Sequence, residues 1–391
     1  MAMRQAVPVE SRSCTILEPM APAAPNTATF LSVKYMACAP DFWKRRGAPD
    51  AAARDKPAGP GVRSPAVENR GARSGRPLAL RTAGGYPMTP CVSRLRLAAV
   101  AAAVCLACSV AALRLPDAVV TEADVDYGEA GGQKLLLDVF RPAIQNGPAP
   151  AVLIIHGGGW AGGDKKEPVY RQMAETLARA GYVVFNANYR LARNGTNRYP
   201  AALDDVQRAV RWIRANAGRY DVAPRRIGAL GASAGGHLAA LLGTRETRDN
   251  SDRQLARHSS KVQCVVDVFG PADFTVRDGQ PLNPAAIGIL MNFLGKTPQE
   301  APDLYREASP VAHVDRGDAP FLIFHGDRDM LVPIDQSRRL HAALQKAGVP
   351  SELVVMQGEG HGFARRENQE RFAAASLAFF DRHLRGGRAA R

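Results

Sequence analysis

Cysteine is almost absent from the chain after Leu113. Five of the six cysteines precede that residue, and only Cys264 falls in the 278 residues that follow. This part of the chain therefore cannot form a disulfide between its own residues. Cys264 lies inside the apolar run 262–269, which favours a buried, unreactive thiol over a nucleophile.

The same part of the chain has little excess charge of either sign. Before Leu113, fifteen Lys and Arg residues stand against six Asp and Glu, whereas from Arg114 onward thirty-six stand against thirty-one. The net charge of +14 is therefore mainly a property of the N-terminal part. No basic run interleaved with aromatic residues follows Arg114, so no nucleic-acid partner is expected.

Residues 1–87 lack the periodicity of a helix or strand that buries one face. They are rich in Pro, Gly, Ala and Arg. This composition indicates a disordered segment, or an upstream extension that does not belong to the natural product.

Residues 88–113 have the pattern of an export signal. A short basic segment starts at Met88, the apolar stretch 97–113 follows, and Ser109-Val-Ala111 suits a cleavage site. If translation begins at Met88, this predicts a cleaved signal peptide and a periplasmic or secreted protein. Two alternatives remain: a membrane anchor, for which seventeen apolar residues are marginal, and lipid attachment at Cys108.

Strand and helix patterns alternate from Val119 on, which predicts an α/β domain over 114–391. Such alternation calls for a mostly parallel sheet with helices on both faces, here opened by an antiparallel hairpin. No internal repeat is visible. The strands are expected at 119–127, 134–140, 151–155, 182–187, 226–230, 262–269, 321–324 and 352–356, and the helices at 168–180, 201–217, 236–242, 334–347 and 367–384.

The stretch around Ser233 is the strongest chemical signal. Gly231-Ala-Ser233-Ala-Gly235 fits G-x-S-x-G, in which small residues allow a strand to turn abruptly into a helix with the serine exposed at the bend. The predicted strand before it and the predicted helix after it supply the context that this motif requires. Ser233 is therefore a candidate nucleophile.

A serine nucleophile needs a base and an acid that orients the base. His361 is the best-placed base, because it lies in a glycine-rich loop directly after the strand 352–356. Asp327 and Asp329 follow the strand 321–324, and one of them would be the acid while the other caps the turn. The chain order serine, aspartate, histidine is that of α/β-hydrolases.

His156-Gly-Gly-Gly-Trp160 follows the strand 151–155. Three consecutive glycines suit a loop whose N–H groups approach a reacting carbonyl and stabilise its negative charge. A phosphate-binding loop is the alternative, but the Lys-Ser/Thr ending of a P-loop is missing.

Together these motifs resemble the α/β-hydrolase superfamily over about 119–384. The resemblance is to its esterase branch, which includes hormone-sensitive-lipase-like carboxylesterases and bacterial esterases acting on feruloylated or acetylated sugars. It rests on the glycine loop up to Lys165, on the serine motif up to His237 and on the aspartate loop up to Pro333.

The resemblance assigns a role to each motif. It makes Ser233 the nucleophile, His361 the base and Asp329 the acid. Backbone N–H groups would form the oxyanion hole, and a cap of about 270–310 with an apolar patch at 287–294 would select the substrate. Trp160 is expected either to line the substrate cleft or to be a plain core residue. The N–H groups of the oxyanion hole would come from Gly158, Gly159 and Ala234.

The expected activity is hydrolysis of short-chain carboxylic esters through an acyl-enzyme, on a small-molecule or sugar-borne substrate. The resemblance implies no metal and no cofactor. An amidase, formamidase or peptidase on the same fold stays open, because a triad alone does not choose ester over amide. A binding protein without turnover is the alternative from another class. No feature of the sequence indicates an oligomeric state.

Overall fold

The computed structural model describes residues 118–275 and 284–386 of the chain. The predicted extension at 1–87 and the predicted signal segment at 88–113 lie outside the described residues. Within the part described, no helix combines the length and the apolar character that a membrane span requires.

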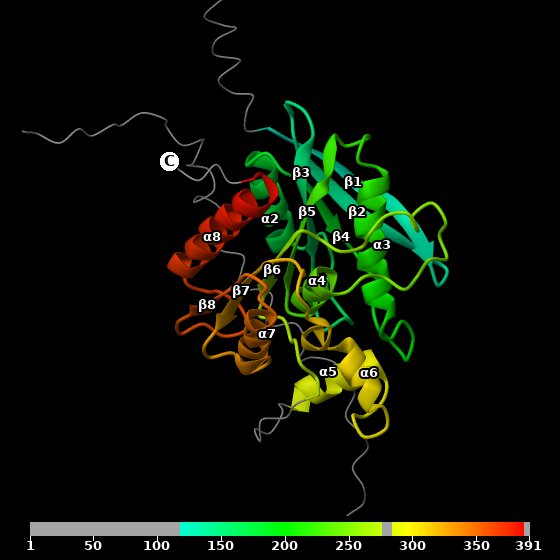
Figure 1. Cartoon of the computed structure of the whole chain (residues 1–391), viewed down its shortest axis with the longest axis vertical. Helices are drawn as coiled ribbons and strands as arrows, with labels where there is room; N and C mark the ends of the chain where they lie inside the picture. Colours follow the sequence, from blue (N-terminus) through cyan, green and yellow to red (C-terminus); the bar gives the residue numbers. More distant parts are fainter. Residues whose placement is uncertain (1–117, 276–283, 387–391) are drawn as a thin grey trace, which may run out of the picture.

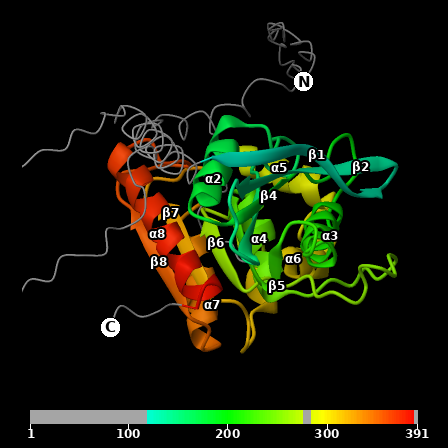
Figure 2. The same ribbon diagram turned by 90° about the horizontal axis from the view of Figure 1, so that it is seen from above.

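An eight-stranded sheet forms the centre of the molecule, in the order β1-β2-β4-β3-β5-β6-β7-β8. The pairs β1–β2 and β2–β4 are antiparallel and every other pair is parallel, which confirms the predicted sheet with its opening hairpin. Figure 2 shows that hairpin at the end of the sheet opposite β8. The strands are β1 (Val119–Ala130), β2 (Gln133–Pro142), β3 (Ala149–Ile155), β4 (Val183–Ala187), β5 (Val222–Ala232), β6 (Cys264–Val268), β7 (Phe321–Gly326) and β8 (Ser351–Met356).

Helices cover both faces of the sheet because its central strands are apolar on both sides. In β3, Leu153 and Ile155 join the hydrophobic cluster that contains α3, α4 and α7, while Val152 and Ile154 join the cluster that contains α2 and α8. Figure 1 shows α8 and α3 on opposite sides of the sheet. These helices are α2 (Pro168–Arg179), α3 (Ala201–Ala215), α4 (Ala234–Thr244), α7 (Asp335–Lys346) and α8 (Arg366–Leu384).

The segment between β6 and β7 contains α5 (Pro284–Leu294), α6 (Pro302–Ala308) and the 3-10 helix η3 (Pro310–His313). The apolar patch expected at 287–294 lies within α5, whereas α6 and η3 were not expected from the sequence. Both of these begin with proline, whose fixed φ suits the first turn of a helix. In Figure 1, α5 and α6 lie together at one end of the molecule.

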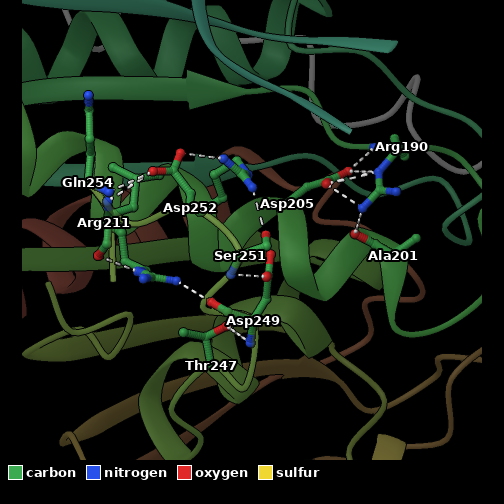
Figure 3. Close-up of polar contacts among 11 residues, drawn as sticks. Arg190, Ala201, Asp205, Arg211, Thr247, Asp249, Ser251, Asp252 and Gln254 are labelled. Carbon is green, nitrogen blue, oxygen red and sulfur yellow. Dashed lines mark hydrogen bonds and ion pairs between the residues drawn. The ribbon is translucent and has the colours of Figure 1, made fainter. Parts of the chain in front are cut away.

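Arginines of α3 hold the long loop 245–261, which has little regular structure of its own. Buried Arg211 donates to the backbone carbonyls of Asp249 and Leu255, at 2.5 and 2.8 Å. On the same helix, Asp205 accepts a bidentate ion pair from Arg190, the residue that follows β4 by three positions (Figure 3). Side chains of α3 thus hold two of the loops that connect the strands: the loop after β4, through Arg190, and the loop 245–261.

Candidate active site

Ser233 lies at the turn between β5 and α4, as the motif predicts. Its backbone has φ 56° and ψ −121°, a conformation that non-glycine residues rarely adopt and that places the side chain at the tip of the turn. The Ser233 hydroxyl makes no capping hydrogen bond to α4. It is therefore available to another partner.

The two glycines of the motif are required by close backbone contacts. A Cβ atom on Gly231 would lie 2.1 Å from the carbonyl oxygen of Gly235, and a Cβ on Gly235 would lie 2.1 Å from the carbonyl oxygen of Ile155. The turn can form only where these side chains are missing, because backbone atoms cannot move aside. The local sequence thus fixes the position of Ser233.

The structure brings Ser233, His361 and Asp329 together from three separate loops. His361 Nε2 lies 2.9 Å from Ser233 Oγ, and His361 Nδ1 lies 2.6 Å from Asp329 Oδ2. The side chain of Asp329 is fully buried and that of His361 is 9% exposed. This is the geometry in which a carboxylate orients an imidazole and the imidazole can take a proton from the serine.

Asp329 is held as a carboxylate by several donors. Its Oδ1 accepts the backbone N–H groups of Leu331 and Val332, both at 2.9 Å, and His325 Nε2 lies 3.4 Å from Oδ2. Burial alone would raise the pKa of Asp329, but the hydrogen bonds from His325 and His361 lower it below its usual range. The group therefore stays ionised beside His361.

Asp327, the competing aspartate, faces a different partner. Its Oδ1 accepts the backbone N–H of Gly358 at 2.6 Å, and it is exposed. This contact joins the loop after β7 to the loop after β8. Asp327 has the turn-stabilising environment that the sequence allowed for either aspartate.

Glu359 braces the loop that carries His361, a contact that the sequence did not indicate. Its carboxylate accepts the N–H groups of Ala364 and Arg365, both at 2.9 Å, and the side-chain amide of Asn368 at 2.8 Å. These bonds tie the histidine loop to the start of α8. The nearest signal was the acidic residue inside a glycine-rich loop.

The glycine loop after β3 has a conformation that only glycine tolerates. Gly158 and Gly159 have φ of 110° and 59°, and a Cβ on Gly158 would lie 2.4 Å from the carbonyl oxygen of Gly162. The N–H groups of Gly158 and Gly159 form no hydrogen bond with another described residue. Both glycines line the same cavity as Ser233 and Ala234.

A buried ion pair anchors the far end of the glycine loop. Lys165, with its side chain 1% exposed, places Nζ 2.5 Å from Asp138 Oδ1 on β2 and 2.7 Å from Asp124 Oδ1 on β1. The Lys165 backbone also bonds the side chains of Asn188 and Asn186, at 2.7 and 2.6 Å. The sequence placed Lys165 in the motif but did not indicate this role.

Trp160 is a core residue that also lines the cavity. Its ring stacks on Phe293 of α5 with centroids 4.0 Å apart, and its Nε1 donates to His237 Nδ1 at 3.2 Å. His237 in turn donates from Nε2 to the carbonyl of Ala308, at 2.7 Å. Burial lowers the pKa of His237 to about 4, so it stays neutral and links the glycine loop to α6.

His156 is buried beneath the same loop. Its Nδ1 lies 2.8 Å from the carbonyl of Gly157, and its ring stacks on Tyr189. Burial lowers the pKa of His156 to about 4. His156 therefore stays neutral and braces the glycine loop from below.

The described residues line a cavity of about 260 Å³ beside Ser233 and His361. Helix α5 forms one wall, and Ile289 comes closest to the glycine loop, 3.0 Å from where a Cβ of Gly159 would lie. Among residues 118–275 and 284–386, no three His, Cys, Asp or Glu side chains gather as metal ligands would. The apolar side chains of the wall include Trp160, Phe269, Phe274, Ile287, Ile289, Leu290, Leu331 and Val332.

The sheet topology and the serine–histidine–aspartate geometry define this molecule as an α/β-hydrolase. A family model described as BD-FAE matches residues 137–344. The chain belongs to the BD-FAE family.

Known relatives agree with this classification. The chain is 33% identical to the esterase LipC of Mycobacterium tuberculosis over 242 residues, which cover 61% of this chain and 58% of LipC. It thus spans little more than half the length of this curated relative.

Two solved structures are similar over almost their whole length. One is a truncated carbohydrate esterase from gut microbiota, with 28% identity, a TM-score of 0.59 and coverage of 68% of this chain and 96% of that one. The other is a butyrate-bound thermophilic esterase from the Planctomycetes species Thermogutta terrifontis, with 26% identity, a TM-score of 0.58 and coverage of 71% and 98%.

Proposed function

We propose that the protein is a serine hydrolase that cleaves short-chain carboxylic esters through an acyl-enzyme intermediate. The observation that carries this proposal is the continuous contact from Ser233 Oγ through His361 to Asp329, at 2.9 and 2.6 Å. The esterase names of the relatives support the same reaction class.

In this proposal His361 accepts and then donates a proton twice, once during acylation and once during deacylation. Nε2 accepts the proton of Ser233 as Oγ attacks the ester carbonyl, and Asp329 stabilises the imidazolium that forms. Nε2 then donates that proton to the departing alcohol oxygen, which leaves an acyl-Ser233. A water molecule, deprotonated by His361, attacks the acyl carbon, and the proton returns to Ser233 as the carboxylic acid leaves.

The N–H groups of Gly158, Gly159 and Ala234 are the proposed oxyanion hole. Ala234 N–H begins α4, where the helix dipole favours negative charge. The N–H groups of both glycines have no partner among the described residues, so they can bind the oxygen that becomes negative. Loss of one such donor typically lowers kcat by about 10²–10³.

The cavity supports a preference for short acyl groups. At about 260 Å³ it lies just below the roughly 300–1,000 Å³ of pockets that hold drug-sized ligands. Trp160 and Ile289 close it near the glycine loop. Helix α5 is held at this end of the cavity by the stacking of Phe293 on Trp160.

Rates across p-nitrophenyl esters of increasing chain length test this function. We expect kcat/KM to be highest for acetyl to butyryl esters and to fall for longer chains. A maximum at about twelve carbons or beyond would contradict the short-acyl preference. Absence of ester turnover together with good amide cleavage would instead move the protein to the amidase or peptidase class.

Export is a further part of the proposal. It is supported by the basic and apolar pattern of 88–113, which lies outside the described residues. A protein exported to the periplasm or medium would meet polymer-bound acyl groups, so aryl or sugar-borne esters are the proposed natural substrates. The membrane-anchored form remains the alternative.

A further inference from the structure

The largely apolar wall of the cavity has a polar corner formed by Asp273 and Gln336, in addition to polar side chains elsewhere in the wall: Tyr170, Thr297, Gln299 and Tyr305. Asp273, in the loop after β6, and Gln336, in the first turn of α7, both line the cavity. Asp273 is only 7% exposed. A carboxylate is costly to bury unless it has a partner, and the charged partner of Asp273 is Arg339, with Nη1 3.9 Å from Oδ2.

The two side chains are held rigidly by the backbone around them. Gln336 Oε1 accepts the N–H groups of Ala272 and Asp273, at 2.9 and 2.8 Å. Because the oxygen is fixed, the amide nitrogen of Gln336 is the end left for substrate, and it makes no hydrogen bond within the described part of the chain.

The two carboxylate oxygens of Asp273 have different partners. Its Oδ1 accepts the N–H and the hydroxyl of Thr275, at 2.9 and 2.7 Å. Its Oδ2 forms the ion pair with Arg339 Nη1, which at 3.9 Å is longer than a hydrogen bond. Oδ2 can therefore accept a hydrogen bond from a molecule in the cavity.

In sheet order, this corner lies on the His361 side of Ser233. The glycine loop follows β3 and Ser233 follows β5, while Asp273, Gln336 and His361 follow β6, β7 and β8 in sheet order. An ester bound for attack directs its carbonyl oxygen to the glycine loop and its alcohol oxygen to His361, which protonates it. The alcohol part of the ester therefore lies toward Asp273 and Gln336.

We propose that Asp273 and Gln336 form a subsite that binds hydroxyl groups on the alcohol part of the substrate. This inference rests on the proposed esterase function and narrows its substrates to esters of polyhydroxylated alcohols. A hydroxyl donates to Oδ2 of Asp273, and the same or a neighbouring hydroxyl accepts from the Gln336 amide. An ammonium group fits less well, because the amide donors and Arg339 would face it.

The test compares two esters with the same acyl group and the same three-carbon alcohol skeleton. 1-Butyrylglycerol carries two free hydroxyls, and propyl butyrate carries none. We expect the wild-type full-length chain to show a kcat/KM at least about tenfold higher for 1-butyrylglycerol. We expect Asp273→Asn, which keeps the shape and replaces an acceptor by a donor, to lower that ratio about tenfold, as loss of a hydrogen bond to a charged group would.

A second variant and a matched control make the result decisive. Gln336→Glu keeps the oxygen that holds the loop but removes the amide donors, and it should lower the ratio in the same direction. Asp335→Asn removes the neighbouring carboxylate, which pairs with Arg338 and does not line the cavity, and should leave the ratio unchanged. Thermal unfolding of each variant shows whether it folds. If only one of Asp273→Asn and Gln336→Glu folds, the ratio measured for that variant tests the inference.

Two results would overturn the inference. One is a wild-type ratio near one, and the other is a ratio that survives in both Asp273→Asn and Gln336→Glu. Neither would affect the proposed function, since both require ester turnover. If the wild-type chain hydrolyses neither ester nor any p-nitrophenyl ester, the proposed function itself fails.

Discussion

Asp327 and Asp329 stand two positions apart after β7 and have opposite surroundings. Asp329 is buried against His361 and His325, whereas Asp327 is exposed and bonds the backbone of Gly358. The sequence predicted that one of them serves His361 but could not choose between them from spacing alone. The choice depends on which side chain the turn points inward, and the N–H groups of Leu331 and Val332 decide that.

The different surroundings of the two aspartates predict different effects of replacing each one by asparagine. Asp329→Asn should lower kcat on p-nitrophenyl butyrate by several orders of magnitude, because an amide cannot stabilise the imidazolium. The corresponding change in a serine protease lowers kcat by about 10⁴. Asp327→Asn keeps an oxygen for the Gly358 N–H and should lower kcat less than about tenfold. Equal losses, or a larger loss at Asp327, would reverse the assignment.

Residues of the site differ in whether a local sequence pattern places them. Ser233 and His361 could be predicted because a local motif or a strand end places each of them. Glu359 could not, because its partners are backbone N–H groups whose positions follow from the folded loop. Asp273 and Gln336 meet from different loops, so no spacing connects them.

At the scale of elements, the glycine loop is anchored by chemistry that lies outside its own motif. Lys165 lies at the end of the loop, and its ammonium group forms ion pairs with Asp138 on β2 and Asp124 on β1. The strands and helices of the core were predictable because their apolar patterns are regular. Helix α6 was not, because its seven residues are too few to show a period.

We expect Lys165→Met to destabilise the protein, because Lys165 anchors the glycine loop to β1 and β2. Removing one partner of a buried pair leaves the Asp138 carboxylate uncompensated, which typically lowers the free energy of unfolding by about 3–5 kcal/mol. Urea unfolding monitored by circular dichroism measures the change.

The double variant Lys165→Met/Asp138→Leu serves as the control for this prediction. It removes both charges and should recover most of the lost stability. A loss below about 1 kcal/mol in Lys165→Met would show that the buried pair does not anchor the loop. An equally unstable double variant would show that packing, and not charge, is responsible.

At the scale of the whole molecule, the fold is built around one sheet whose two faces are covered by different helices. The two hydrophobic clusters combine side chains of strands and helices from β1 to α8 with side chains of the connecting loops. This architecture could be predicted because strand and helix patterns alternate along the chain. The order of β4 and β3 in the sheet could not, because it depends on crossover connections and not on local pattern.

A shortened chain that begins at Arg114 should fold and keep full activity. The reason is that residues 1–87 show no pattern able to bury a face, while the packed sheet described here starts at Val119. Thermal unfolding and kcat/KM on p-nitrophenyl butyrate, compared with the full-length chain, check this. An insoluble or inactive product would show that the upstream segment is structural.

N-terminal sequencing of the protein isolated from its native host complements this prediction. A mature N-terminus just after Ser109-Val-Ala111 would agree with the cleaved signal. An intact 88–113 segment in the membrane fraction would favour the anchor instead.

Covalent labelling tests whether Ser233 is an activated nucleophile. The full-length wild-type chain is treated with a fluorophosphonate probe and the adduct is located by peptide mass spectrometry, with Ser233→Ala as the matched control. We expect one adduct on Ser233, loss of esterase activity in step with labelling, and no labelling of Ser233→Ala. Esterase activity that persists in Ser233→Ala, or an unlabelled wild-type chain, would contradict this role of Ser233.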